Sequence, residues 1–206
     1  MRRLYLWIEM IFMFLGLPVL YFYEMIPVHK AIPLVLVFLY CLLIIIKDKN
    51  FDREIFRIRR DYPWQDILLK GSVLLVITSI WVYVFRADVF FHLPRNNFWI
   101  WIAVIVSYPI WSAYTQEFIF RAFFFHRYKI LFSSPLVMLL INAFCFAMAH
   151  IIFRNWLALI FTFIGSLIFS YTYLRNKSLN AAFLEHSLYG NILFTNGLGI
   201  YFYLPM

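Results

Sequence analysis

Three short polar stretches stand in the second half of an otherwise apolar chain. The first, residues 115–121, holds a glutamine, a glutamate and an arginine, the second ends at His150, and the third covers residues 185–191. A charged side chain in the hydrocarbon core of a membrane costs several kcal/mol unless it faces a partner or water, so such residues mark a functional site by default. Glu117 and Arg121 are four residues apart, share one face of a helix and are expected to pair.

A glutamate, two histidines and an asparagine on three helices can carry out acid–base chemistry. A carboxylate accepts a proton from water, an imidazole orients that water, and further donors stabilise an oxyanion. In this scheme Glu117 is the base, His150 assists it, and His186 with Asn191 holds the oxyanion. The same histidines and glutamate could instead bind zinc. The common zinc signature, two histidines one helical turn apart, is missing. We therefore expect no resident metal and no cofactor.

Each of these residues also has a purely structural interpretation. Glu117 and Arg121 could form an ion pair that only holds helices together. A single histidine in a membrane helix is more often a hydrogen-bonded packing residue than a catalyst, and Asn142 and Asn191 could simply bond across helices. Convergence of several polar residues on three helices favours the functional interpretation.

The expected depths of the polar residues support part of this convergence. At the helical rise per residue, Glu117 and His186 lie roughly 15 and 13 Å from the same membrane face. His150 falls at roughly 24 Å, which is one or two turns too deep for the same level if its helix is straight.

The composition places these residues in a membrane. Hydrophobic residues make up 65% of the 206 residues and charged residues 14%, whereas soluble domains carry about 25% charged residues. The recurring apolar runs predict an all-α, polytopic membrane protein. Seven spans can be drawn, at 4–23, 31–46, 67–85, 98–126, 133–152, 156–174 and 179–202. The fourth is too long for one straight span, and Pro109 predicts a kink in it.

The chain divides into two parts. Residues 1–97 supply N-terminal membrane helices and a basic cytoplasmic loop, and residues 98–206 supply the helices of the expected catalytic core. With the N-terminus inside, thirteen of the eighteen lysines and arginines lie on the inner side, Arg121 lies within the membrane, and the outer side has only Lys30, Arg86, Arg95 and Arg154. This asymmetry predicts an N-in, C-out topology. It also argues against nucleic-acid binding, because no basic stretch lies outside the membrane-flanking segments.

At its polar stretches the sequence resembles the CAAX-protease and bacteriocin-processing family, also called the Abi family. The family pattern is Glu-Glu-x-x-x-Arg, then Phe-x-x-x-His, then His-x-x-x-Asn, on successive helices. The corresponding residues here are Gln116-Glu117 with Arg121, Phe146 with His150, and His186 with Asn191. The first set differs at one position, and the third has one extra residue.

The resemblance covers roughly residues 98–202. It implies an intramembrane endopeptidase of glutamic or metallopeptidase type, in a bacterial-type inner membrane, with its site open toward the cytoplasmic side. It also implies a membrane-embedded peptide or protein as substrate and the lipid bilayer as surroundings, with zinc in the metallopeptidase case.

Gln116 is the departure that leaves alternatives open, because it stands where the family has the glutamate usually assigned as the base. An amide cannot act as a general base near neutral pH. Either Glu117 takes over, or the chain is an inert member that binds and protects or scaffolds a membrane peptide. A small transporter is a third alternative, since polar mid-membrane residues suit it equally, although no paired broken helices support it.

The spacing of the motifs predicts two local distortions. Adjacent residues on a helix are turned by about 100°, so an active protein needs a rotated or distorted helix that turns Glu117 toward His150, with Gln116 left to donate a hydrogen bond to substrate or water. Asn191 lies about 140° around a regular helix from His186. Its oxyanion role therefore requires the helix to unwind near Gly190.

Overall fold

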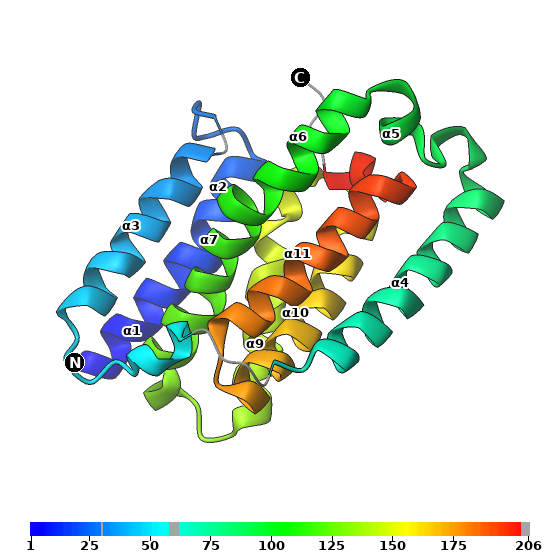
Figure 1. Cartoon of the computed structure of the whole chain (residues 1–206). Coiled ribbons are helices and arrows are strands. Elements are labelled where there is room, and N and C mark those ends of the chain that lie inside the picture. The colour runs from blue at the N-terminus through cyan, green and yellow to red at the C-terminus, as the bar shows by residue number, and fades with distance from the viewer. Residues whose placement is uncertain (30, 58–61, 203–206) are drawn as a thin grey trace.

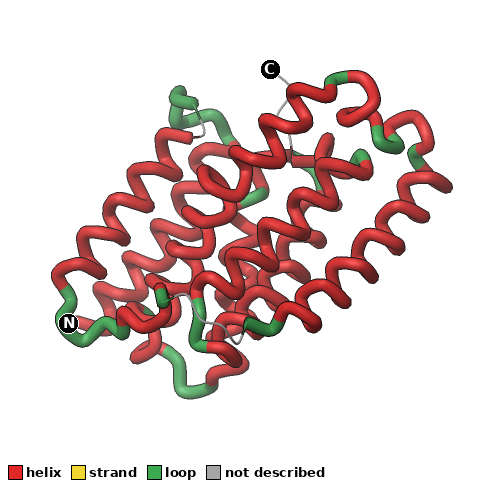
Figure 2. Tube along the Cα trace, viewed as in Figure 1, coloured by secondary structure: helices red, strands yellow, loops and turns green. Residues whose placement is uncertain are grey.

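The computed structural model describes residues 1–29, 31–57 and 62–202, and within these ranges every regular element is a helix (Figures 1 and 2). The predicted all-α class is confirmed. The α-helices are α1 Arg2–Ile11, α2 Leu17–Phe22, α3 Ala31–Lys47, α4 Trp64–Phe85, α5 His92–Asn96, α6 Phe98–Tyr108, α7 Tyr114–Glu117, α8 Phe124–Arg127, α9 Pro135–Ala149, α10 Trp156–Asn176 and α11 Leu179–Asn196. Short 3-10 turns occupy Arg53–Phe56, Ala87–Val89, Lys129–Leu131, Ile151–Phe153 and Leu198–Phe202.

In the part of the chain that the structure describes, five continuous helices are long and apolar enough to cross a membrane. They are Arg2–Phe22, Trp64–Phe85, Phe98–Arg127, Pro135–Phe153 and Trp156–Asn176. Helix α3 is apolar but has only 17 residues, and α11 carries the third polar stretch. The count of seven spans and the N-in, C-out orientation therefore stay predictions.

The fourth predicted span is one long helix that is locally distorted on both sides of its polar motif. Two π-helical segments, Pro109–Ala113 and Phe118–Phe123, flank helix α7. Pro109 has no N–H to donate and cannot continue a regular α-helical ladder, which explains why the first distortion begins there. The expected local distortion of this helix is present.

Three helices that surround the motif begin at side-chain caps. Ser134 accepts a hydrogen bond from the N–H of Val137 at the start of α9, and Ser178 accepts one from Ala181 at the start of α11. The Asn155 side chain accepts one from the N–H of Ala158 at the start of α10. Such caps satisfy N–H groups that have no partner inside the helix. Helix α10 then packs against α9 and α11, and α11 packs against α4 and α6.

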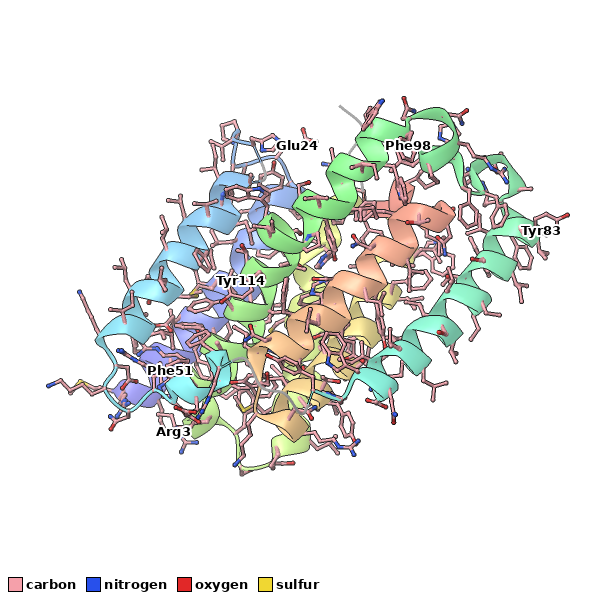
Figure 3. The ribbon with its side chains drawn as sticks, in the orientation of Figure 1. Arg3, Glu24, Phe51, Tyr83, Phe98 and Tyr114 are labelled. Atoms are coloured by element: carbon pink, nitrogen blue, oxygen red, sulfur yellow. The ribbon has the colours of Figure 1, made fainter. Side chains whose placement is uncertain are left out.

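The bundle has two distinct ends, which Figure 3 marks by labelled side chains. Arg3 and Phe51 lie at the end that carries the N-terminus, and Glu24 and Phe98 lie at the opposite end. The basic loops between α3 and α4 and between α8 and α9 are at the first end (Figure 1). Lys30, Arg59 and Arg60, which the charge comparison includes, lie outside the described residues.

The orientation of the bundle can be tested with topology reporters. Since basic residues concentrate at the N-terminal end, fusions after Lys129 and Lys177 should report the cytoplasm. Fusions after Arg95 and at the end of the chain should report the outside. A cytoplasmic C-terminus would contradict the seven-span topology.

Candidate functional site

A buried ion pair lies at the centre of the bundle. The Oε2 atom of Glu117 is 3.0 Å from Nε of Arg121, and both side chains are fully buried. The expected pairing within one helical turn is confirmed. The guanidinium has two further partners, because Nη1 donates to Oδ1 of Asn142 at 2.6 Å and Nη2 donates to Oγ of Ser166 at 3.2 Å. The cation is thus held by three helices.

Asn142 on α9 links these helices. Its Nδ2 donates to the backbone carbonyl of Phe120 at 2.8 Å, and its Oδ1 also accepts from Ser170 at 3.0 Å. It bonds across helices, in agreement with its structural interpretation. The sequence motifs did not identify Ser166 and Ser170 on α10 as part of this network. Their only sequence signal is two hydroxyls four residues apart, on one face of an apolar helix.

His186 on α11 contacts the second oxygen of Glu117. Its Nδ1 is 2.8 Å from Oε1 of Glu117, and its ring stacks on Phe169 with centroids 4.5 Å apart. An ionised carboxylate only accepts hydrogen bonds, so Nδ1 donates and a neutral imidazole keeps its lone pair on Nε2. Glu117 therefore fixes the ring and its tautomer.

His150, directly after α9, is fixed in the same tautomer by a different acceptor. Its Nδ1 donates to the backbone carbonyl of Phe146 at 2.8 Å, and a carbonyl can only accept. The Phe146 ring contacts both imidazoles, with centroids 4.8 Å from His150 and 5.7 Å from His186. Both histidines thus lie around one aromatic ring and keep Nε2 as an acceptor.

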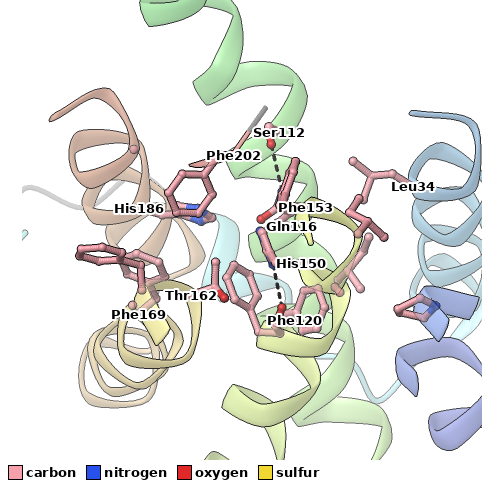
Figure 4. A pocket seen from close by; sticks show the side chains of 18 of the residues that line it. Leu34, Ser112, Gln116, Phe120, His150, Phe153, Thr162, Phe169, His186 and Phe202 are labelled. Carbon is pink, nitrogen blue, oxygen red and sulfur yellow. Dashed lines mark hydrogen bonds between the residues drawn. The ribbon is translucent and has the colours of Figure 1, made fainter. Parts of the chain in front are cut away.

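The two imidazoles line a cavity of about 480 Å³. Figure 4 shows Gln116, His150 and His186 on its walls, which are otherwise mostly apolar. Gln116 donates from Nε2 to Oγ of Ser112 at 2.9 Å, and its Oε1 is buried with no hydrogen-bond partner in the described part of the chain. The N-terminal helices complete the wall, with Met13, Leu17 and Leu34 among the lining residues.

The predicted site residues separate into two groups. Gln116, His150 and His186 line the cavity, whereas Glu117, Arg121 and Asn191 do not. The prediction that the distorted helix turns Glu117 toward His150 is wrong, because Glu117 is fully buried against Arg121 and His186. Adjacent positions are turned by about 100°, so with Glu117 in the ion-pair network it is Gln116 that faces the cavity.

Asn191 lies away from the cavity because α11 does not unwind at Gly190. The helix runs unbroken from Leu179 to Asn196. The Nδ2 of Asn191 donates to the backbone carbonyl of Ile105 at 3.3 Å, so this side chain ties α11 to α6. The local unwinding that its oxyanion role requires is absent.

Glu185, the acid beside His186, points elsewhere. Its Oε1 lies 3.3 Å from Nζ of Lys70 and accepts a hydrogen bond from the Tyr189 hydroxyl at 3.0 Å. Lys70 is also 2.6 Å from Asp66 in the first turns of α4. Glu185 is fully buried, and these contacts join α11 to α4.

The cavity reaches toward the end of the bundle opposite the N-terminus. Its lining residues include Tyr21 and His29, which lie on either side of Glu24 in the sequence, and Glu24 is at that end (Figure 3). In the predicted N-in orientation this end faces the outside, whereas the family resemblance implies a site toward the cytoplasm. Both expectations cannot hold for this cavity, and the topology reporters described above decide between them.

The donor set does not fit a zinc site. Catalytic zinc needs three protein ligands and an open position. The wall offers two imidazoles, and the nearest carboxylate, Glu117, is already engaged by Arg121 and His186. Within the described ranges, no three His, Cys, Asp or Glu side chains come together in a way that could hold a metal ion.

Residues 94–192 match the family model described as "Type II CAAX prenyl endopeptidase Rce1-like". This segment is therefore similar to the CAAX-protease family. The resemblance predicted from the motifs is thereby confirmed, and the matched segment contains all six predicted site residues. No curated protein and no solved structure matches the chain. Together with its apolar helices, the CAAX-protease segment identifies a multi-pass membrane protein related to a family of proteases.

The ion pair should dominate the stability of this region. Arg121→Met leaves Glu117 buried without its cation, and breaking a buried pair from one side costs about 3–5 kcal/mol. Unfolding in detergent, followed by heat or denaturant, should therefore show a strong loss of stability.

The double variant Glu117→Gln with Arg121→Met removes both charges and should be more stable than Arg121→Met alone. Arg175→Met is the matched control, since Arg175 is exposed. Equal stability of Arg121→Met and Arg175→Met would contradict a paired, buried Arg121.

Proposed function

We propose that the chain is an intramembrane endopeptidase that cleaves a membrane-associated peptide or protein, with His186 as the base. The contact that carries the proposal is the 2.8 Å hydrogen bond from Nδ1 of His186 to the buried carboxylate of Glu117, at the wall of the cavity. A carboxylate that fixes an imidazole and stabilises its protonated form is a recurring arrangement for water and hydroxyl activation.

In the proposed reaction His186 accepts a proton from water through Nε2, and the water oxygen attacks the peptide carbonyl carbon. Glu117 stabilises the imidazolium that forms, and Arg121 with Asn142 and Ser166 keeps Glu117 in place. The tetrahedral intermediate then collapses, the carbon–nitrogen bond breaks, and His186 returns the proton to the leaving amine. Glu117 thus acts through His186 and does not itself accept the proton from water.

The other polar side chains of the cavity wall, His150 and Gln116, can position water and substrate. His150 keeps an acceptor at Nε2, since its Nδ1 is held by the Phe146 carbonyl, and we propose that it orients the attacking water. The unpartnered Oε1 of Gln116 can accept an N–H of the substrate backbone. The mostly apolar lining favours a substrate that reaches the site from within the membrane. A bacterial-type inner membrane as the location rests on the family resemblance.

A second candidate function is peptide binding without cleavage. The observation that favours it is the lack of any carboxylate on the described cavity wall, where Gln116 supplies an amide. An inert member of the family would hold a membrane peptide in the cavity through Gln116 and the two imidazoles.

Turnover of membrane-inserted peptides in detergent separates these candidates. His186→Asn removes the base while keeping a polar side chain, so cleavage should fall by roughly a hundredfold or more. Glu117→Gln leaves the ring without its stabilising charge and should cause a loss of similar order. Gln116→Ala should cost less, because it removes only hydrogen bonds.

His126→Asn is the matched control, because His126 pairs with Asp48 away from the cavity. Full activity of His186→Asn would rule out His186 as the base. An inert wild-type protein that gains turnover as Gln116→Glu would support the binding function instead.

Chelation tests the catalytic type. Because the donor set does not fit zinc, activity should survive exhaustive treatment with a chelator. Stoichiometric zinc in the purified protein, together with loss of turnover when it is removed, would establish the metallopeptidase type.

A further inference from the structure

Tyr108, the last residue of α6, lies on the cavity wall beside the proposed base. Its ring meets the His186 ring edge to face, with centroids 6.0 Å apart, and packs on Phe194 at 5.1 Å. It stands directly before Pro109, where the long helix becomes π-helical. The position of the hydroxyl is therefore fixed by the contacts of the ring with His186 and Phe194 and by the π-helical segment that follows Tyr108.

Gly190 on α11 makes room for the Tyr108 hydroxyl. A Cβ at this position would overlap Cε1, Cζ and the hydroxyl oxygen of Tyr108. Gly190 comes four residues after His186, so both lie on one face of α11. Any larger residue there would displace the hydroxyl from the part of the wall next to His186.

The Tyr108 hydroxyl is an unused donor. Among the described residues it has no hydrogen-bond partner, whereas the neighbouring Tyr189 donates to Glu185. A buried or half-buried tyrosine hydroxyl usually finds a partner. A ligand in the cavity, where Tyr108 and His186 both line the wall, would supply one.

We propose that Tyr108 donates a hydrogen bond to the oxyanion of the tetrahedral intermediate. The proposal rests on the proposed endopeptidase function. When water attacks the carbonyl carbon and its proton passes to Nε2 of His186, the carbonyl oxygen becomes negative and needs a donor on the same side of the cavity. A phenolic hydroxyl is a neutral donor at ordinary pH. Asn191, expected from sequence to fill this role, is bonded to α6 instead.

The Tyr108 hydroxyl then stabilises the transition state and does not contribute to the stability of the fold. A donor aimed at the developing charge raises kcat without tightening substrate binding equally. Tyr108→Phe keeps the ring and its contacts with His186 and Phe194 and removes only the hydroxyl. Its kcat should fall on the order of a hundredfold, with KM and the unfolding temperature close to those of the wild type.

Tyr114→Phe is the matched control. Tyr114 lies on the same long helix, packs on Phe183 and is not part of the cavity wall, so its variant should keep wild-type kcat. An unchanged kcat in Tyr108→Phe overturns the proposal. A clear drop in its unfolding temperature also overturns it, because the hydroxyl would then hold the fold.

Two variants distinguish a failure of the oxyanion role of Tyr108 from a failure of the endopeptidase function. Wild-type turnover that is lost in His186→Asn but kept in Tyr108→Phe refutes the role of Tyr108 alone. If only Gln116→Glu turns over, the same comparison is made in that background with the same criteria. If neither protein cleaves any membrane-inserted peptide, both the endopeptidase function and the oxyanion role of Tyr108 are refuted.

Discussion

The ion pair between Glu117 and Arg121 is the constraint on which the rest of the structure depends. Both charges are fully buried at 3.0 Å from each other, in a bundle with several helices that are apolar enough to cross a membrane. Their desolvation is compensated only if every remaining donor and acceptor finds a partner. Asn142 and Ser166 accept hydrogen bonds from the guanidinium of Arg121, and His186 donates one to the carboxylate of Glu117. These partners come from three other helices, so satisfying one pair of charges brings α9, α10 and α11 to the same point.

The ion pair also decides which side chain the long helix presents to the cavity. Because neighbouring helical positions are turned by about 100°, Gln116 and Glu117 cannot both face the cavity and both join the charged network. Arg121 lies one turn from Glu117 and holds it inside. Gln116 is left on the wall, bonded to Ser112. The carboxylate therefore acts on the cavity through His186, and the amide contacts whatever occupies the cavity.

The sequence predicted the parts of this arrangement that follow from spacing. The all-helical fold, the pairing of Glu117 with Arg121 and the position of the three polar stretches on separate helices are properties of periodicity and composition. The prediction that Glu117 and not Gln116 faces the cavity was wrong. Which of the two side chains faces it depends on partners that are distant in sequence. Ser166 and Tyr108 were not recognised, since a hydroxyl or an aromatic ring in an apolar helix is usually a packing residue. The direction of the cavity depends on how helices of both halves of the chain meet, which local patterns do not encode.

The result is a site divided into a charged part that is sealed among helices and a neutral part that lines the cavity. The charged part contains Glu117 and Arg121, and the neutral part contains two imidazoles, an amide and a tyrosine. Such a division suits a membrane, because the wall can stay apolar enough for a membrane-embedded chain while a full charge lies one hydrogen bond behind it. In surroundings of low dielectric constant that charge acts strongly on the imidazole. The glutamine at position 116 thus removes a charge from the wall without removing the carboxylate from the site, because Glu117 stays hydrogen-bonded to His186 on that wall.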